Sequence, residues 1–145
     1  MLNNTRNEIL EYIPQRQPIV MIDAVESFDH NQVVCKLTVR ESNMFVAEGK
    51  LLEAGIIENI AQTIAAGAGC RAKMQNQKVR LGYIAAIKKL SISALPSVGE
   101  TVTTCVQVLN EVFNVSIVQA SVTCGETMIA ECEMRIFLEE TQEIK

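Results

Sequence analysis

Apolar residues are most dense in the middle of the chain, where residues 53–69 read EAGIIENIAQTIAAGAG. No charged side chain lies between Glu58 and Cys70. The apolar positions cover most of a helical circumference: Ile56, Ile57, Ile60, Ala61, Ile64, Ala65 and Ala68. This pattern predicts a buried helix over about 53–74. The segment is too short and too rich in small polar residues to predict a membrane span.

Strand-like patterns flank this helix on both sides. They predict six strands, at 19–28, 32–40, 79–94, 100–109, 112–124 and 127–138. Asn110-Glu111 predicts a turn, and Gly125-Glu126 predicts a two-residue hairpin loop. Gly82, inside its strand, predicts a bulge or a close approach of another segment. In the last strand alternation predicts one shared face for Met128, Ala130, Cys132, Met134, Ile136 and Leu138.

The order of the elements predicts an α+β fold in which a curved antiparallel sheet wraps around one long central helix. A short helix is expected at 5–13, with Thr5 as its cap, and a loop at 41–51. One sheet covers only one side of a helix that is apolar nearly all round. A second subunit is the simplest source of further cover, so we expect a homodimer or a heterodimer.

Composition narrows the class of protein. The 145 residues, 48% of them apolar, predict a single domain, 1–145, with its own core. The net charge of −4 without a basic run argues against a nucleic-acid partner. Five cysteines without CxxC spacing argue against a disulfide framework or a metal site, and no cofactor is implied. Without a signal peptide or a membrane span, we expect a cytoplasmic protein.

Glu58 is the first candidate for chemistry. It lies one turn inside a helix that should be covered by protein, and a buried carboxylate is costly unless it is paired, hydrogen-bonded or used. Gln62, four residues on, shares its helix face and is expected to orient it. The alternative is a purely structural carboxylate, satisfied by backbone groups or by Arg16. The only histidine, His30, falls in the turn between the first two strands, and we expect it to be an ordinary exposed residue.

Several motifs resemble those of bacterial beta-hydroxyacyl-acyl-carrier-protein dehydratases, which have the hotdog fold. IPQRQPIVMIDAV (13–25) is similar to their opening segment, LPHRYPFLLVDRV, and GIIENIAQ (55–62) is similar to LIIEAMAQ of their central helix. The stretches from 79 and from 94 resemble the strands that follow. The extended AQTIAAGAG helix is also similar to the dehydratase-like proteins of aryl-polyene and flexirubin-type pigment pathways.

The resemblance implies a site at a dimer interface. In the family a helix carboxylate, here Glu58, works with a histidine of a GHFP motif from the other subunit, and backbone N–H groups at the helix start polarise the thioester carbonyl. This chain departs from that pattern. Met44, in SNMFVAEG, stands where the histidine belongs, and Gln15 replaces the histidine of the opening motif. Gly55 is the residue that would let a backbone N–H approach a ligand.

The remaining candidates are expected to bind substrate or to support the fold. Asn43 and Met44 are expected to line an acyl tunnel, and Phe45 and Tyr83 either line that tunnel or belong to the core. Arg16 and Asp23 of the opening motif are expected to be structural.

Three functions remain open. The leading one is a dehydratase-like protein acting on 3-hydroxyacyl thioesters of acyl carrier protein, or of coenzyme A, in fatty-acid or polyene synthesis. In that reading the chain acts alone with altered chemistry, or as a degenerate subunit beside a histidine-containing hotdog partner. The second is a hotdog thioesterase using Glu58. The third is a non-catalytic acyl-binding partner subunit.

Overall fold

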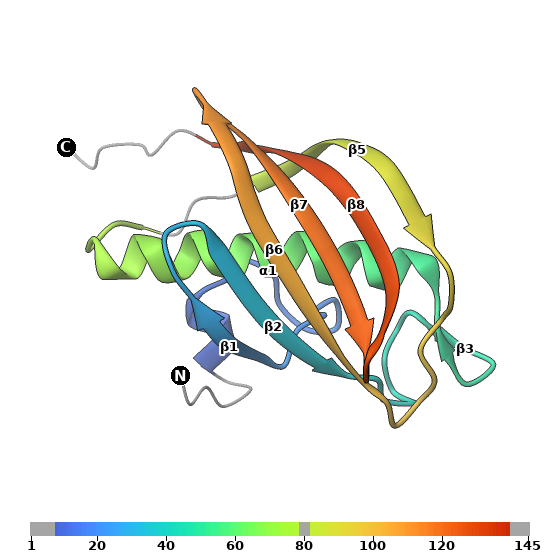
Figure 1. The fold of residues 1–145 in the computed structure, drawn as a ribbon. Helices are drawn as coiled ribbons and strands as arrows, with labels where there is room; N and C mark the ends of the chain where they lie inside the picture. The colour runs from blue at the N-terminus through green and yellow to red at the C-terminus, as the bar shows by residue number, and fades with distance from the viewer. Residues whose placement is uncertain (1–7, 79–81, 140–145) are drawn as a thin grey trace.

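The computed structural model describes residues 8–78 and 82–139, and it consists of one long helix wrapped by one large antiparallel sheet (Figure 1). The elements are, in chain order, the 3-10 helix η1 (Glu8–Glu11), β1 (Ala24–Phe28), β2 (Gln32–Thr38), β3 (Val46–Ala47), β4 (Lys50–Leu51), α1 (Glu53–Met74), β5 (Gly82–Ile92), β6 (Thr101–Val112), β7 (Val115–Cys124) and β8 (Thr127–Leu138). The predicted helix at 53–74 and the predicted α+β class are confirmed.

The large sheet has the strand order β1-β2-β6-β7-β8-β5, with every neighbouring pair antiparallel. Its register shifts in β1, in β5, near the end of β6, and between Val122 and Thr123 of β7. Such irregularities bend strands and increase their twist, which fits the curvature around α1 in Figure 1. Strand β5 forms an edge of this sheet, and β3 and β4 form a separate hairpin just before α1.

The helix has one closed side and one open side. Ile56, Ile60 and Ile64 are buried in a core that also takes side chains from β1, β2 and β6–β8. The open side is a stripe at alternating spacings of four and three residues, in which every member is partly or fully exposed. This open stripe consists of Ala54, Glu58, Ala61, Ala65 and Ala68. One sheet therefore leaves part of α1 uncovered, as the sequence pattern led us to expect.

Several predicted boundaries differ from the observed ones. The strand predicted at 19–28 begins only at Ala24, because residues 19–21 hydrogen-bond to side chains of α1 instead of to a strand. Within residues 8–13, the described part of the helix predicted at 5–13, there is a single 3-10 turn, η1, and Thr5 lies outside the described residues. The loop expected at 41–51 contains the β3–β4 hairpin. Of the strand predicted at 79–94, residues 79–81 are outside the described part.

The strands after α1 correct two further predictions. The turn predicted at Asn110-Glu111 is wrong, because β6 continues to Val112 and the chain turns at Phe113-Asn114, where Phe113 has φ 57°. The Gly125-Glu126 hairpin is confirmed, with Gly125 at φ 63°. Met128 is exposed and does not share the buried face of β8. Val122 pairs with Ala130, but the next residue of β7, Thr123, pairs with Met128. Ile129 is therefore an extra residue in β8, and it is buried.

Gly82 lies at the start of β5 and is a point of close approach. A Cβ placed there would meet Ile136 and Leu138 side-chain atoms at 3.1 Å. The bulges of β5 fall later in the strand, so of the two alternatives only the close approach is found. No helix in the described part of the chain is long and apolar enough to span a membrane.

Candidate functional site

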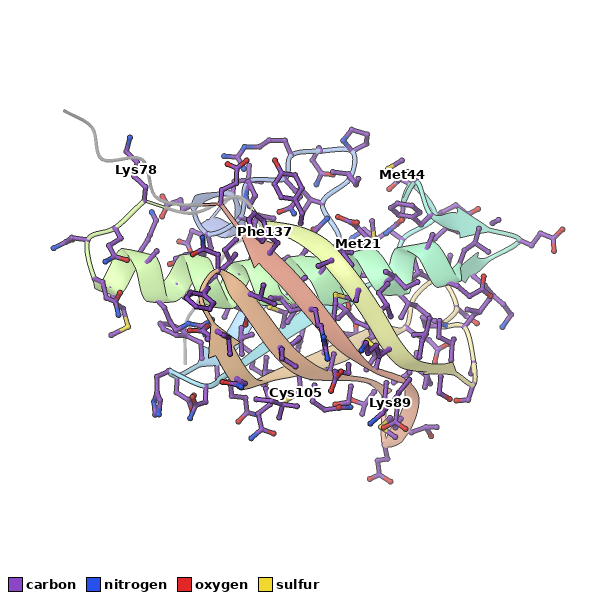
Figure 2. All side chains as sticks on the ribbon, turned by 90° about the horizontal axis from the view of Figure 1, so that it is seen from above. Met21, Met44, Lys78, Lys89, Cys105 and Phe137 are labelled. Carbon is purple, nitrogen blue, oxygen red and sulfur yellow. The ribbon has the colours of Figure 1, made fainter. Side chains whose placement is uncertain are left out.

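The site begins with a segment that precedes β1 and runs alongside α1. The backbone N–H of Met21 donates to Gln62 Oε1 at 2.6 Å, and the Met21 carbonyl accepts from Asn59 Nδ2 at 2.8 Å. Met21 is fully buried, and Figure 2 shows it beside α1. Because these bonds use the polar groups that a strand would need, the apolar run starting at Ile19 does not join the sheet here.

Gln62 is held from both ends of its carboxamide. Its Oε1 accepts from Met21, and its Nε2 donates to the carbonyl of Ile19 at 2.8 Å. A backbone N–H only donates and a carbonyl only accepts, so these two partners fix which end of the amide is oxygen and which is nitrogen. The same Nε2 donates to Glu58 Oε1 at 2.8 Å. The predicted proximity of Gln62 to Glu58 is therefore observed.

Glu58 is only partly buried in this chain and belongs to the open stripe of α1. The alternative partner, Arg16, donates to the carbonyls of Ile13 and Gln15 instead. Asp23, the other residue of the opening motif, accepts from Thr38 N and pairs with Arg40 at 2.9 Å. In the described contacts Arg16 binds carbonyls of its own turn, whereas Asp23 links the start of β1 to residues at and beyond the end of β2.

Asn59 joins the site to the sheet. Its side-chain oxygen accepts a 2.5 Å hydrogen bond from the Thr104 hydroxyl of β6, and its Nδ2 binds the Met21 carbonyl. Both Asn59 and Thr104 are buried. Sequence reasoning missed these residues and Met21. An asparagine inside an otherwise apolar helix was the available signal, since a buried amide needs partners.

The loop before β3 lies near the start of α1. Asn43 Oδ1 accepts from Phe45 N at 2.8 Å, and Asn43 Nδ2 contacts Met21 Sδ at 3.1 Å. Met44 is 53% exposed, and Figure 2 shows it on this loop. Phe45 packs against Gly55, where an added Cβ would lie 2.8 Å from the Phe45 Cβ. The Gly55 N–H already donates to Leu52 O, so the observed role of Gly55 is close packing.

Tyr83 is not brought to Glu58. It is 50% exposed, its hydroxyl donates to Glu139, and it pairs with Phe137 on the face of the sheet opposite the helix. The tunnel-lining alternative for Tyr83 therefore has no contact supporting it in this chain. His30 is exposed in the turn after β1, as expected.

A small cavity adjoins the open stripe one turn beyond Glu58. It has a volume of about 30 Å³ and is lined by Gln15, Ala61, Ile64, Ala65, Gly82, Ile84, Ile136 and Leu138. Gln15 Oε1 is buried there and has no hydrogen-bond partner within residues 8–78 and 82–139. A larger cavity, about 330 Å³, shares Ile64, Ile136 and Leu138 with it and is also lined by His30 and Arg71.

The buried thiols are poor candidates for nucleophilic chemistry. Burial raises the pKa of Cys35 to about 12 and the pKa of Cys70 to about 11. A thiol is nucleophilic as its thiolate, so both groups are inert near neutral pH. In the described part of the chain no group of three or more His, Cys, Asp or Glu side chains could hold a metal ion.

Comparison with known proteins decides the family. The model of the ApeP-like family, described as ApeP dehydratase, matches residues 7–145. The chain belongs to the ApeP-like dehydratase family. No curated protein matches its sequence significantly. The resemblance to dehydratases seen in the motifs at 13–25 and 55–62 is thereby confirmed.

Solved structures agree on the fold. The dehydratase heterocomplex ApeI:P from Xenorhabdus doucetiae contains a chain with 19% identity and a TM-score of 0.86, covering 91% of each chain. Cj0977 from Campylobacter jejuni has 13% identity and a TM-score of 0.70, covering 91% of this chain and 95% of its own. A hypothetical thioesterase with coenzyme A from Streptococcus pneumoniae has 10% identity and a TM-score of 0.65, covering 83% and 88%. The predicted hotdog fold is confirmed.

Within this ApeP-like protein, the polar contacts converge on one carboxylate. Glu58 is held by Gln62, Gln62 by residues 19–21, and those residues also by Asn59. The single histidine of the chain is at the far end of the helix, beside Arg71 and Gln75. The arrangement thus offers one positioned carboxyl group for proton transfer without a histidine beside it.

Proposed function

We propose that this chain is the glutamate-bearing subunit of a composite dehydratase that acts on 3-hydroxyacyl thioesters of acyl carrier protein, in fatty-acid or polyene synthesis. Glu58 is its catalytic acid, and a histidine-containing hotdog chain supplies the base. Membership of the ApeP-like dehydratase family supports the reaction class.

The observation that carries the proposal is an oriented carboxylate without a base beside it. Glu58 is held at 2.8 Å by Gln62 on the open stripe. His30 lines a cavity with Arg71, thirteen residues further along α1, which corresponds to about 20 Å of helix. No single protomer can therefore bring its own histidine to its own Glu58 in this fold.

Two surfaces support assembly with a second chain. The open stripe leaves Glu58 and its four alanines partly or fully exposed. Strand β5 is a long edge strand, and edges of this kind pair readily with another chain. The relative with a TM-score of 0.86 is part of a dehydratase heterocomplex, which favours a different chain over a second copy as the partner.

The chemistry is a syn- or anti-elimination of water. The partner's histidine removes the proton alpha to the thioester, the C–O bond at position 3 breaks, and a C=C bond forms. Glu58 gives its proton to the leaving hydroxyl, which departs as water. Acid and base groups placed in this way contribute about 10²- to 10⁴-fold each. Asn43, Met44 and Phe45, on the loop near the start of α1, are the proposed acyl contacts.

Formation of the 2,3-enoyl thioester, measured by mass spectrometry on a 3-hydroxyacyl-acyl-carrier-protein, tests the proposal. We expect negligible turnover by this chain alone and turnover when a histidine-bearing hotdog chain is added. Glu58→Gln should lower the dehydratase activity of this mixed complex at least a hundredfold. Glu53→Gln, an exposed carboxylate in the first turn of the same helix, is the matched control and should retain it.

Three outcomes contradict the proposal. Enzyme-like dehydration by the chain alone would mean that a base other than histidine lies in this chain. Hydrolysis of acyl thioesters by the pure chain, lost in Glu58→Gln, would instead make it a thioesterase. If the mixed complex keeps its full activity with Glu58→Gln, this chain is a non-catalytic acyl-binding subunit.

A further inference from the structure

We infer that residues 19–21 are the positioning element of the Glu58 site: through Gln62 they hold Glu58 Oε1 as a hydrogen-bond acceptor and leave Oε2 as the oxygen that exchanges a proton with the substrate. The inference concerns the orientation of one carboxyl group. Its catalytic consequence rests on the proposed function, whereas the orientation itself does not.

The first step is the fixed orientation of Gln62. Met21 N–H meets Oε1 at 2.6 Å and Ile19 C=O meets Nε2 at 2.8 Å. Turning the amide over would place two acceptors against each other at Ile19 and two donors against each other at Met21. Each buried group left unpaired costs about 1–3 kcal/mol. Gln62 is completely buried, so water cannot replace either partner.

The second step is the consequence for Glu58. Because the orientation is fixed, Gln62 presents an N–H, and not its oxygen, to the nearer carboxyl oxygen of Glu58, Oε1. An oxygen that carries the carboxyl proton is a poor acceptor for that N–H. The proton of a protonated Glu58 therefore resides on Oε2. In a composite site, this is the oxygen that gives a proton to the leaving hydroxyl.

The third step is that Met21 also restrains the loop that precedes β3. Met21 is bound through its N–H, its carbonyl and its sulfur, by Gln62, Asn59 and Asn43 respectively. Asn43 belongs to the loop that precedes β3 and also accepts from Phe45 N. One buried residue thus fixes both the carboxylate on the helix and the loop near the start of α1.

Hydrogen exchange of the Gln62 side-chain amide, followed by ¹⁵N NMR on the full chain, tests the orientation without any activity. We expect slow exchange of both Nε2 protons, because one meets Ile19 O and the other meets Glu58. In Glu58→Ala, one proton should exchange at least tenfold faster while the Met21 N–H stays protected. Glu53→Ala is the control and should change neither. Equal, rapid exchange of both protons in the unmutated chain would overturn the inference.

The catalytic consequence needs the mixed complex. Gln62→Met keeps the volume but removes the donor, and should lower kcat about 10- to 100-fold with KM within twofold, the effect of losing one hydrogen bond to a charged group. Asn59→Leu also removes a bond to Met21 but does not touch Glu58, so kcat should fall much less.

A double variant decides whether Gln62 acts through Glu58. Combining Gln62→Met with Glu58→Gln should be no worse than Glu58→Gln alone. Fully additive losses would overturn the positioning role. If the Gln62 amide protons exchange slowly but the chain gives no dehydratase activity with a partner, the proposed function is rejected and the orientation of Glu58 still holds.

Discussion

The closed and open sides of α1 differ in how completely this chain satisfies its own polar groups. On the closed side, Gln62 and Asn59 bind backbone groups of Met21 and Ile19, and Asn59 also binds the sheet. On the open side Glu58 is partly exposed, and Gln15 Oε1 is buried at the adjoining cavity with no partner in the described chain. The difference teaches that the polar groups on the closed side are satisfied within one protomer, whereas those on the open side are not all satisfied by the described residues.

The largest effect on stability is expected from Gln62→Met. The substitution leaves Met21 N–H and Ile19 C=O buried without partners, at about 1–3 kcal/mol for each group. We expect the free energy of unfolding of the single chain to fall by about 2–4 kcal/mol, measured by urea denaturation. A fall below about 1 kcal/mol would mean that the closed side is not held by this amide.

Gly69→Ala tests the closed side by volume. A Cβ at this position would overlap the carbonyl oxygen of Tyr12, which belongs to backbone and cannot rotate away. Overpacking of this kind costs about 1–3 kcal/mol. Ala68→Ser, the neighbouring position on the open stripe, should cost much less, and similar losses from both changes would remove the distinction between the two sides.

Ala65→Gln tests the open side. The side chain is partly exposed in the protomer, so the unfolding free energy of the single chain should change by less than about 0.5 kcal/mol. If a partner chain covers the stripe, its association should weaken at least about tenfold, equivalent to about 1.4 kcal/mol. Titration by analytical ultracentrifugation measures this. Unchanged association would show that the partner binds elsewhere.

The smallest effect is expected from Gln15→Leu, and its sign is opposite. Removing a buried acceptor that has no partner in the described chain should leave stability unchanged or raise it by up to about 1 kcal/mol. Thermal denaturation of Gln15→Leu and of Gln62→Met, each compared with the unmutated protomer, measures these opposite changes in stability. A loss of more than about 1 kcal/mol would indicate that the protomer itself satisfies Gln15, contrary to the comparison of the two sides.

The sequence by itself determined the features that depend on near neighbours. The apolar run at 53–74 fixed the helix, because burial at helical spacing needs no knowledge of the partner. The Gly125-Glu126 hairpin followed from the backbone freedom of Gly125. The approach of Gln62 to Glu58 followed from a spacing of four residues. Resemblance of the helix and opening motifs gave the hotdog fold and the dehydratase family.

Only the tertiary structure decided which groups complete those local patterns. The apolar run from Ile19 reads as a strand, yet Met21 bonds to side chains 38 and 41 residues away. Tyr83 was open as tunnel lining or core until its register against Phe137 placed it on the outer face. Gly55 was expected to leave an N–H for a ligand, but the helix start itself uses that N–H. Periodicity reports whether a residue is covered, whereas hydrogen-bond partners far apart in the chain are chosen by the packing of whole elements.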